Sequence, residues 1–441
     1  MKRLLSLLLC AVLALFCATT AQAAGVSITL TASEYALHYA FDAGAQDPFV
    51  ILEYTTPAEK GWMMLYSEDG HFEGDVSLAY SGAGGKTSVA LTSARTTGSI
   101  GKASTTLPKA ADYQKPTGKS NAKVMDFVLT ETPEGFHYAF NAAGTDYMLL
   151  YWRSKEQTVT QPVYPDENGH YEGDNISELT YARTQYTVQV KSGSGSMKKE
   201  ATVRKGYQAP EAPQRQEGRL SGVTVCIDAG HQENGRFVNE PIGPGLTGST
   251  SGKGGMAQGT KTNRRESIVC LEIGMLLRDE LLRQGANVIM TREDQTTFHT
   301  NIERCEIAEA GGAQIMLRLH CNNSSNRSKR GIQVYGPLNS DYAKAVADAD
   351  TYREMGQKLL DAMKMRVGMT LANSTGMVRL NDNYVGNNWA KMMCFLVEMG
   401  YLSNPAEEYL LVTPVYQQWL AEGMADGVFE IAVARGGVQA Q

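Results

Sequence analysis

The stretch VTVCIDAGH, residues 223–231, begins the part of the chain whose pattern decides the fold. Its apolar, β-branched start is typical of a strand that is buried on both faces of a largely parallel sheet. Four similar runs follow: NVIMT (287–291), IMLRL (315–319), IQVYG (332–336) and CFLVE (394–398). Segments with helical periodicity lie between them, at 265–284, 301–311 and 342–366. This alternation predicts an α/β domain with a largely parallel sheet flanked by helices.

Four polar side chains stand at the ends of these predicted elements. His231 follows the first strand, His320 and Glu398 each end a later strand, and Glu266 opens the helix at 265–284. The functional crevice of such sheets lies beyond the carboxyl ends of the strands, so three of the four share one edge. Two histidines and one carboxylate are the ligands that a catalytic zinc prefers, with one position left for water. A further carboxylate can move protons, and the pattern therefore predicts a zinc hydrolase.

Four motifs carry a resemblance to a known family. IDAGH (227–231), RRES (264–267), LHCNN (319–323) and LVEMGYLSNPAEE (396–408), in this order, resemble the zinc-dependent N-acetylmuramoyl-L-alanine amidases of the amidase 3 type. The resemblance covers residues 219–435, about half of the chain. These enzymes cleave the amide between muramic acid and L-alanine in peptidoglycan.

The resemblance implies a role for each of the four polar residues. The family's metal ligands correspond to His231, Glu266 and His320, and its catalytic carboxylate corresponds to Glu398. The chain departs from the family pattern in AGHQENGRF (229–237) and in NNWAKMMCFLVE (387–398), where a proline often precedes the strand. Neither departure removes a ligand.

Each of these residues also has a simpler interpretation. His231 could be a loop histidine, His320 a satisfied core histidine, and Glu266 an acid favoured by the helix dipole. An acid at the end of a buried strand, such as Glu398, is costly unless it is paired or functional. It is the joint pattern that favours a metal site.

Several nearby residues are candidates for supporting roles. Asp228 and Asn322 are candidates for groups that orient the metal histidines, although capping of strand ends explains them equally well. Arg304 is expected to form a structural ion pair, and His299 is expected to lie at the surface. Neither a dinucleotide fingerprint nor a phosphate loop occurs, so Zn²⁺ is the only cofactor that the sequence implies.

Residues 232–262 are rich in Gly, Pro, Ser and Thr and separate the first two candidate ligands. Loops of this length in compact domains are usually functional or disordered. We interpret this one as a substrate flap beside the zinc, with a passive surface loop as the alternative.

The first 23 residues have the features of a secretory signal peptide. A Lys-Arg start, a short apolar core and small residues at Ala21 and Ala23 predict cleavage after Ala23, with an uncleaved membrane anchor as the alternative. The protein is then secreted, and extracellular or associated with the cell wall. Loss of Lys2 and Arg3 leaves 39 basic and 47 acidic residues, a net charge of −8, which argues against nucleic acid as a partner.

The region between the leader and the α/β domain contains an internal repeat. HYAF occurs at 38–41 and 137–140, and GHFEGD (70–75) recurs as GHYEGD (169–174), in both cases 99 positions later. Short alternating apolar runs separated by turn residues predict two small all-β, sandwich-like modules. The expected division is a leader at 1–23, repeats at 24–98 and 123–204, linkers at 99–122 and 205–218, and the catalytic domain at 219–441.

The repeats contain paired histidines. His71, Glu73 and Asp75, with their equivalents His170, Glu172 and Asp174, could form a metal or glycan site, but a hairpin turn explains GHxEGD more simply. The repeats are expected to bind the wall or to position the enzyme, with a ligand that the sequence does not identify.

Five cysteines remain after loss of the leader, at positions 226, 270, 305, 321 and 394. They are dispersed in apolar segments without CxxC spacing, so they are expected to be small buried side chains rather than a disulfide framework.

Three functions fit these observations. The first is a zinc amidase that acts on peptidoglycan. The second is a zinc peptidase or carboxypeptidase that trims stem peptides, and the third is an inactive wall-binding relative. The third is disfavoured because all four key residues are present.

Overall fold

The computed structural model describes residues 19–22, 25–78, 81–111, 123–132, 135–143, 148–154, 158–176, 183–192, 195–204, 209–232, 238–250, 255–368 and 377–438. Most of the predicted signal peptide, residues 112–122 of the first linker and residues 205–208 of the second lie outside this set. The chain divides into two compact units. One comprises residues 1–130, 136–175 and 185–201, and the other comprises 131–135, 176–184 and 202–441.

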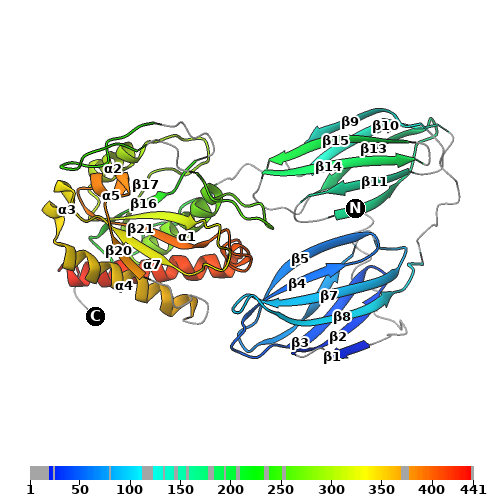
Figure 1. Cartoon of the computed structure of the whole chain (residues 1–441), viewed down its shortest axis with the longest axis horizontal. Coiled ribbons are helices and arrows are strands. Elements are labelled where there is room, and N and C mark those ends of the chain that lie inside the picture. Colours follow the sequence, from blue (N-terminus) through cyan, green and yellow to red (C-terminus); the bar gives the residue numbers. More distant parts are fainter. Residues whose placement is uncertain are drawn as a thin grey trace. The chain divides into compact units, whose positions relative to one another are not determined.

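The second unit is built on a six-stranded sheet with the order β17-β16-β18-β21-β19-β20 (Figure 1). Four strands are mutually parallel: β16 (Thr224–Ala229), β17 (Asn287–Met290), β18 (Ile315–Asn322) and β21 (Met393–Tyr401). The other two, β19 (Gln333–Gly336) and β20 (Met377–Leu380), pair in parallel with each other, and β19 runs antiparallel to β21. The predicted largely parallel sheet is confirmed.

Seven helices accompany this sheet in the described residues: α1 (Glu266–Arg283), α2 (Asn301–Ala310), α3 (Asp341–Val346), α4 (Ala349–Val367), α5 (Val385–Trp389), α6 (Glu407–Leu411) and α7 (Pro414–Ala434). The helix predicted at 342–366 is two helices. Ala347 is extended, and the Asp348 side chain accepts a hydrogen bond from the Thr351 amide to start α4 anew. A local capping residue thus overrides the apolar periodicity.

The helices enclose the sheet from both faces. Helix α1 covers the face that carries Ile227, Ala229 and Leu319. Helix α7 packs against both α1 and α4 and lies alongside α4 in Figure 1. On the opposite face, Cys226, Cys305 of α2 and Cys394 belong to one buried apolar cluster. All five cysteines of the described chain are buried and free, as the sequence predicted.

Antiparallel strands make up the first unit, which confirms its all-β character. A four-stranded sheet has the order β1-β2-β3-β6, a three-stranded sheet β13-β10-β9, and an eight-stranded sheet β15-β14-β11-β12-β5-β4-β7-β8. The strands are β1 (Thr19–Gln22), β2 (Ser27–Ser33), β3 (Ala36–Asp42), β4 (Phe49–Thr55), β5 (Glu59–Tyr66), β6 (His71–Ser77), β7 (Gly85–Ser93), β8 (Ser99–Leu107), β9 (Met125–Glu131), β10 (Gly135–Asn141), β11 (Met148–Arg153), β12 (Thr158–Val163), β13 (His170–Ile176), β14 (Arg183–Ser192) and β15 (Gly195–Arg204).

The repeated sequence motifs occupy equivalent strands. HYAF lies in β3 and again in β10, and the HxEGD residues form the starts of β6 and β13. Strand β12 pairs with β5 through Thr158 opposite Lys60 and Val159 opposite Glu59, which joins both copies in one sheet. Strand β1 lies within the segment that we predict to be cleaved, so processing would remove it from the edge beside β2.

The GHxEGD motif is a turn that leads into a strand. Gly70 has φ 81°, and His71, Glu73 and Asp75 then alternate along the exposed face of β6. His38 contacts Glu73 and Asp75 across the strand pair, while His71 contacts Asp42 and Glu73. All but the contact between His71 and Glu73, which lie in the same strand, are cross-strand pairs of the kind that stabilise a sheet.

Within the described part of the chain, no helix is both long and apolar enough to span a membrane.

Two glycines allow α7 to approach α4 closely. A Cβ atom at Gly427 would lie 2.8 Å from the Leu359 Cα atom, and one at Gly423 would lie 2.7 Å from the Met363 Cα atom. Gly274 in α1 differs, because a Cβ there would meet Ile227 at an ordinary 3.5 Å. Substitution in these two environments can therefore distinguish the effect of helix propensity on stability from the effect of packing.

We therefore expect Gly427→Ala and Gly274→Ala to change stability in opposite directions. Alanine is favoured over glycine inside a helix by roughly 1 kcal/mol, which Gly274→Ala should gain. Gly427→Ala should instead lose about 1–3 kcal/mol, because overpacking against backbone atoms outweighs that gain. Urea denaturation of both variants measures the difference, and equal stabilities would show that the helix pair can relax.

Candidate metal and catalytic site

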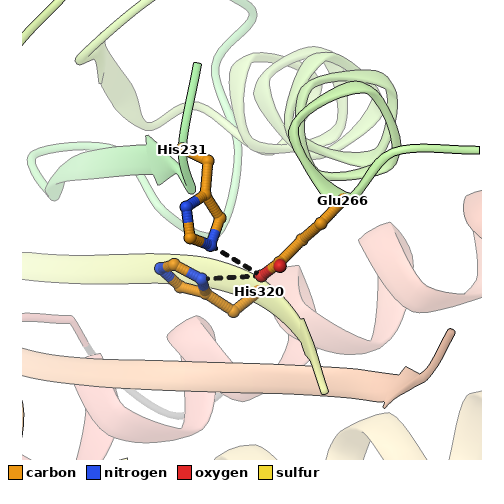
Figure 2. A group of neighbouring side chains, drawn as sticks. All are labelled: His231, Glu266 and His320. Atoms are coloured by element: carbon orange, nitrogen blue, oxygen red, sulfur yellow. Dashed lines mark hydrogen bonds and ion pairs between the residues drawn. The ribbon is translucent and has the colours of Figure 1, made fainter. Parts of the chain in front are cut away.

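Three side chains converge at the carboxyl edge of the sheet, as Figure 2 shows. The Glu266 Oε1 atom lies 3.1 Å from His231 Nε2 and 2.9 Å from His320 Nδ1. One ligand atom from each residue lies within 4.8 Å of the other two, and no other described group of histidines, cysteines and acids meets this condition. The structure therefore brings together the three predicted ligands.

The parallel pairing of β16 and β18 sets the positions of the two histidines. The Gly230 amide donates to the Leu319 carbonyl at 2.9 Å, which places His231 beside His320. A Cβ at Gly230 would lie 2.6 Å from His320 Cε1, so only glycine leaves room for this ring. His231 itself has φ 57°, a left-handed conformation that costs energy in a non-glycine residue and often occurs at functional sites.

Glu266 is fixed at the first turn of α1. Its Oε2 atom accepts the Ala257 amide at 2.8 Å, and its Oε1 atom accepts the Cys321 amide at 3.1 Å. Burial raises the pKa of Glu266, but hydrogen bonds and charge from the two histidines outweigh burial and hold this pKa below its usual range. Burial lowers the pKa of His320. An ionised carboxylate beside a neutral imidazole is the protonation pattern that a metal ligand set requires.

Glu398 lies next to this cluster on β21, opposite His320 in the strand register. Burial, with the charge of Glu266 as a second cause, raises the pKa of Glu398 to about 8. Its Oε2 atom is buried without a hydrogen-bond partner in the described structure. An orphaned buried polar atom is costly, so this oxygen beside the three converging side chains indicates a missing polar group. The residues present therefore fit a metal ion with its bound water.

A cavity of about 970 Å³ opens over these groups and is lined by His231, Glu266, His320 and Glu398. Described parts of the long loop, including Val238, Thr250 and Met256, form one wall. Residues 233–237 and 251–254 of this loop lie outside the described residues.

Two buried carboxylates anchor the described parts of that loop. Glu240 accepts hydrogen bonds from the Asn301 and Ile302 amides at the start of α2. Glu408 accepts the Lys261 amide at 3.0 Å and the Thr262 amide at 3.4 Å. Where it is described, the loop is thus held at the cavity by these hydrogen bonds, and its role as a substrate flap stays a prediction.

Asp228 is fully buried behind the site. It accepts hydrogen bonds from Arg318 at 2.9 Å, from Thr291 at 2.8 Å and from Arg304. Burial raises the pKa of Asp228, but the two arginines outweigh burial and hold it far below its usual range. The expected ion pair of Arg304 is confirmed.

Arg304 connects Asp228 to the backbone of His231, one of the candidate metal ligands. Its guanidinium donates to the Ala229 carbonyl at 2.9 Å and to the His231 carbonyl at 3.1 Å. The interaction between Asp228 and His231 therefore runs through an arginine and the backbone rather than through the imidazole ring. The sequence offered no signal for this arrangement, because Asp228 and Arg304 are 76 positions apart.

Asn322 likewise does not hydrogen-bond to either histidine ring in the described structure. Its amide donates to Gln333 Oε1 at 3.1 Å, and Gln333 lies opposite Glu398 in the register of β19 and β21. His299, which we expected at the surface, lines the cavity, and its carbonyl accepts a hydrogen bond from Arg304. Tyr384 lines the cavity too and was not singled out by the sequence.

The raised pKa of Glu398 predicts a pH-dependent stability of the metal-free protein. A carboxyl whose folded pKa is near 8 contributes stability that is complete below about pH 4.5 and is lost as pH rises through 8. In the presence of a chelator, parent protein should therefore lose on the order of 1–3 kcal/mol between pH 5.5 and 8.5 through this group. Glu398→Gln should remove that part of the slope.

Urea denaturation at both pH values measures this effect. Glu354→Gln, a change at an exposed position of α4, is the matched control and should keep the parental slope. If Glu398→Gln retains the full slope, the carboxyl is ionised in the folded protein throughout this range.

Comparison with known proteins agrees with this geometry. Residues 225–430 match the family model Amidase_3, described as N-acetylmuramoyl-L-alanine amidase. The germination-specific N-acetylmuramoyl-L-alanine amidase of Bacillus subtilis is 26% identical over 231 residues, covering 49% of this chain and 83% of that protein. The probable cell wall amidase LytH of Staphylococcus aureus is 26% identical over 260 residues, covering 58% of this chain and 81% of that protein.

Among solved structures, the N-acetylmuramoyl-L-alanine amidase from Clostridium difficile 630 is 24% identical, with 48% of this chain and 96% of that chain covered and a TM-score of 0.38. The family model covers residues 225–430, which include His231, Glu266, His320 and Glu398. Residues 225–430 of this chain therefore form a domain of the Amidase_3 family of N-acetylmuramoyl-L-alanine amidases.

Proposed function

We propose that this protein is a secreted, zinc-dependent peptidoglycan hydrolase that cleaves the amide between N-acetylmuramic acid and the L-alanine of the stem peptide. The observation that carries the proposal is the convergence of His231, Glu266 and His320 beside Glu398 in one cavity. The Amidase_3 domain supports the choice of bond. Peptidoglycan is thus the substrate, and the wall is the expected location of the protein.

His231, Glu266 and His320 would hold the zinc. When bound, the ion would act as a Lewis acid, polarising the scissile carbonyl and making water acidic enough to attack near neutral pH. Glu266 contributes a negative charge that stays ionised, because hydrogen bonds from His231 and His320 keep its pKa low. Three protein ligands leave one coordination position for chemistry, as in other catalytic zinc sites.

Glu398 is the proton carrier. Its position beside His320 in the strand register places it at the same edge of the sheet as the ligands. Its pKa near 8 in the metal-free site suits a group that first accepts a proton from the attacking water and then delivers it to the nitrogen of the leaving L-alanine. Next to it, Asn322 donates a hydrogen bond to Gln333, which lies opposite Glu398 in the register of β19 and β21.

The product of peptidoglycan digestion tests the bond that is cleaved. An amidase releases the whole stem peptide with a free L-alanine amino terminus, whereas a zinc peptidase shortens the peptide and leaves it on muramic acid. Mass spectrometry of digested wall distinguishes these products. Shortened peptides that remain attached to the sugar would contradict the proposed function.

We expect Glu398→Gln to separate chemistry from metal binding. Glutamine is nearly isosteric, so the variant should bind zinc as the parent does, yet turnover should fall by a factor of about 10²–10⁴ because the proton carrier is lost. Substrate binding should change much less, since the missing interaction belongs mainly to the transition state.

His320→Ala is the complementary variant and should retain far less than one zinc per chain. Elemental analysis and turnover are measured on both proteins. A zinc-loaded Glu398→Gln that cleaves at the parental rate would remove Glu398 from the mechanism, and full zinc occupancy in His320→Ala would remove His320 from the ligand set.

The first unit is proposed to bind the wall through its two repeats, at 24–98 and 123–204, with linkers at 99–122 and 205–218. The second linker includes residues that contact the α/β unit. The Pro210 carbonyl accepts a hydrogen bond from Arg278, and Arg215 donates to the Gly285 carbonyl at 2.9 Å. A chain without the repeats should therefore begin at Ala209 rather than at Gly218.

Such a shortened chain should bind zinc and cleave soluble muropeptides like the full chain, because the site lies entirely within residues 225–430. Its sedimentation with insoluble sacculi should be weaker. Sedimentation equal to that of the full chain would show that the repeats do not contribute to wall binding.

A further inference from the structure

Arg292 is a buried cation immediately behind the proposed metal ligands. It follows β17, its side chain is 2% exposed, and it is absent from the cavity lining. The hydrogen bonds that the described structure gives its guanidinium all go to backbone carbonyl oxygens. An arginine whose hydrogen bonds go to main-chain carbonyls can hold the backbone in one conformation, because its planar guanidinium offers five donors in fixed directions.

The accepting carbonyls belong to residues that flank two of the ligands. Arg292 donates from Nε to the Ala229 carbonyl at 2.8 Å and from Nη2 to the Gly230 carbonyl at 2.9 Å. The same Nη2 atom donates to the Ser267 carbonyl at 2.7 Å. Gly230 precedes His231, and Ser267 follows Glu266. One guanidinium therefore links the backbone next to His231 to the backbone next to Glu266.

This link acts where the backbone needs restraint. His231 has a left-handed φ of 57°, a conformation that costs on the order of 1–3 kcal/mol and persists only when its surroundings enforce it. Arg304 restrains the same turn from the other side through the Ala229 and His231 carbonyls. Arg292 differs from Arg304 because it alone of the two also contacts the first turn of α1, which carries Glu266.

We propose that Arg292 is a positioning residue that sets the approach of His231 to Glu266 and thereby the affinity of the site for zinc. The inference rests on the proposed zinc function and deepens it. Groups that orient metal ligands from behind typically change metal affinity or activity by about 10–100-fold when they are replaced. We expect an effect of that size here, although Arg292 acts on the zinc ligands His231 and Glu266 through the main chain.

The test compares Arg292→Lys with Arg278→Lys in the full chain. Lysine keeps the charge but cannot hold three carbonyls in fixed directions. Arg278 is the matched control, since it is also buried in this unit at 4% exposure and also donates to a backbone carbonyl, that of Pro210 at 2.9 Å. Zinc affinity is measured by competition with a chromophoric chelator, and the stability of the metal-free proteins by urea denaturation.

Both variants should lose stability, but only Arg292→Lys should lose zinc affinity, by about 10–100-fold. Its turnover should return towards the parental value at saturating zinc, which a general loss of structure would not allow. If Arg292→Lys does not fold, Arg292→Gln, which keeps a planar donor, replaces it under the same criterion.

The possible outcomes separate this inference from the proposed function. A parent protein that fails to bind zinc would contradict the function itself. A parent that binds zinc, together with a folded Arg292 variant of equal zinc affinity, would overturn the positioning role alone. Equal losses of zinc affinity in the Arg292 and Arg278 variants would also overturn it, because the effect would then be a general one.

Discussion

The buried charge cluster behind the strand ends is the constraint on which the site depends. Asp228 is fully buried between Arg304 and Arg318, and removal of one partner from such a cluster typically costs about 3–5 kcal/mol. Apolar side chains could fill the same space, but they could not donate to carbonyls. Arg304, held by Asp228, donates to the Ala229 and His231 carbonyls, where the chain leaves the sheet in a strained turn. The buried charges thus fix His231, the first of the proposed metal ligands.

Two carboxylates in this cavity are held in opposite states. Glu266 receives hydrogen bonds from two histidines and two amides, so its pKa is lowered and it stays ionised. Glu398 is buried near that negative charge without a partner for Oε2, and its pKa is raised to about 8. When the surroundings of two acids shift their pKa values in opposite directions, the acids are suited to different chemical roles. The lowered acid suits a ligand, and the raised acid suits a proton carrier.

The sequence was sufficient for the sheet and for the placement of His231, His320 and Glu398 at one edge, because the carboxyl ends of parallel strands meet there. Glu266 reaches the same edge from the start of α1. The sequence was insufficient where tertiary contacts decide. Helix α7 is buried on most sides and has no clear apolar stripe, so its periodicity gives little signal. The partners of Asp228 come from separate elements, so their assembly became visible only in the folded chain.

The repeats show why residue types alone do not define a metal centre. In the first repeat, two histidines flank one glutamate, as they do in the site. His38 Nε2 lies 3.3 Å from Glu73 Oε1, whereas His71 Nε2 lies 3.7 Å from the other oxygen, Oε2. In the α/β unit both histidines approach the same Glu266 oxygen. On the exposed strands of the repeat, these side chains form separate pairs along the strand. In the α/β unit, the left-handed turn at His231 and the close contact at Gly230 let both histidines approach one oxygen.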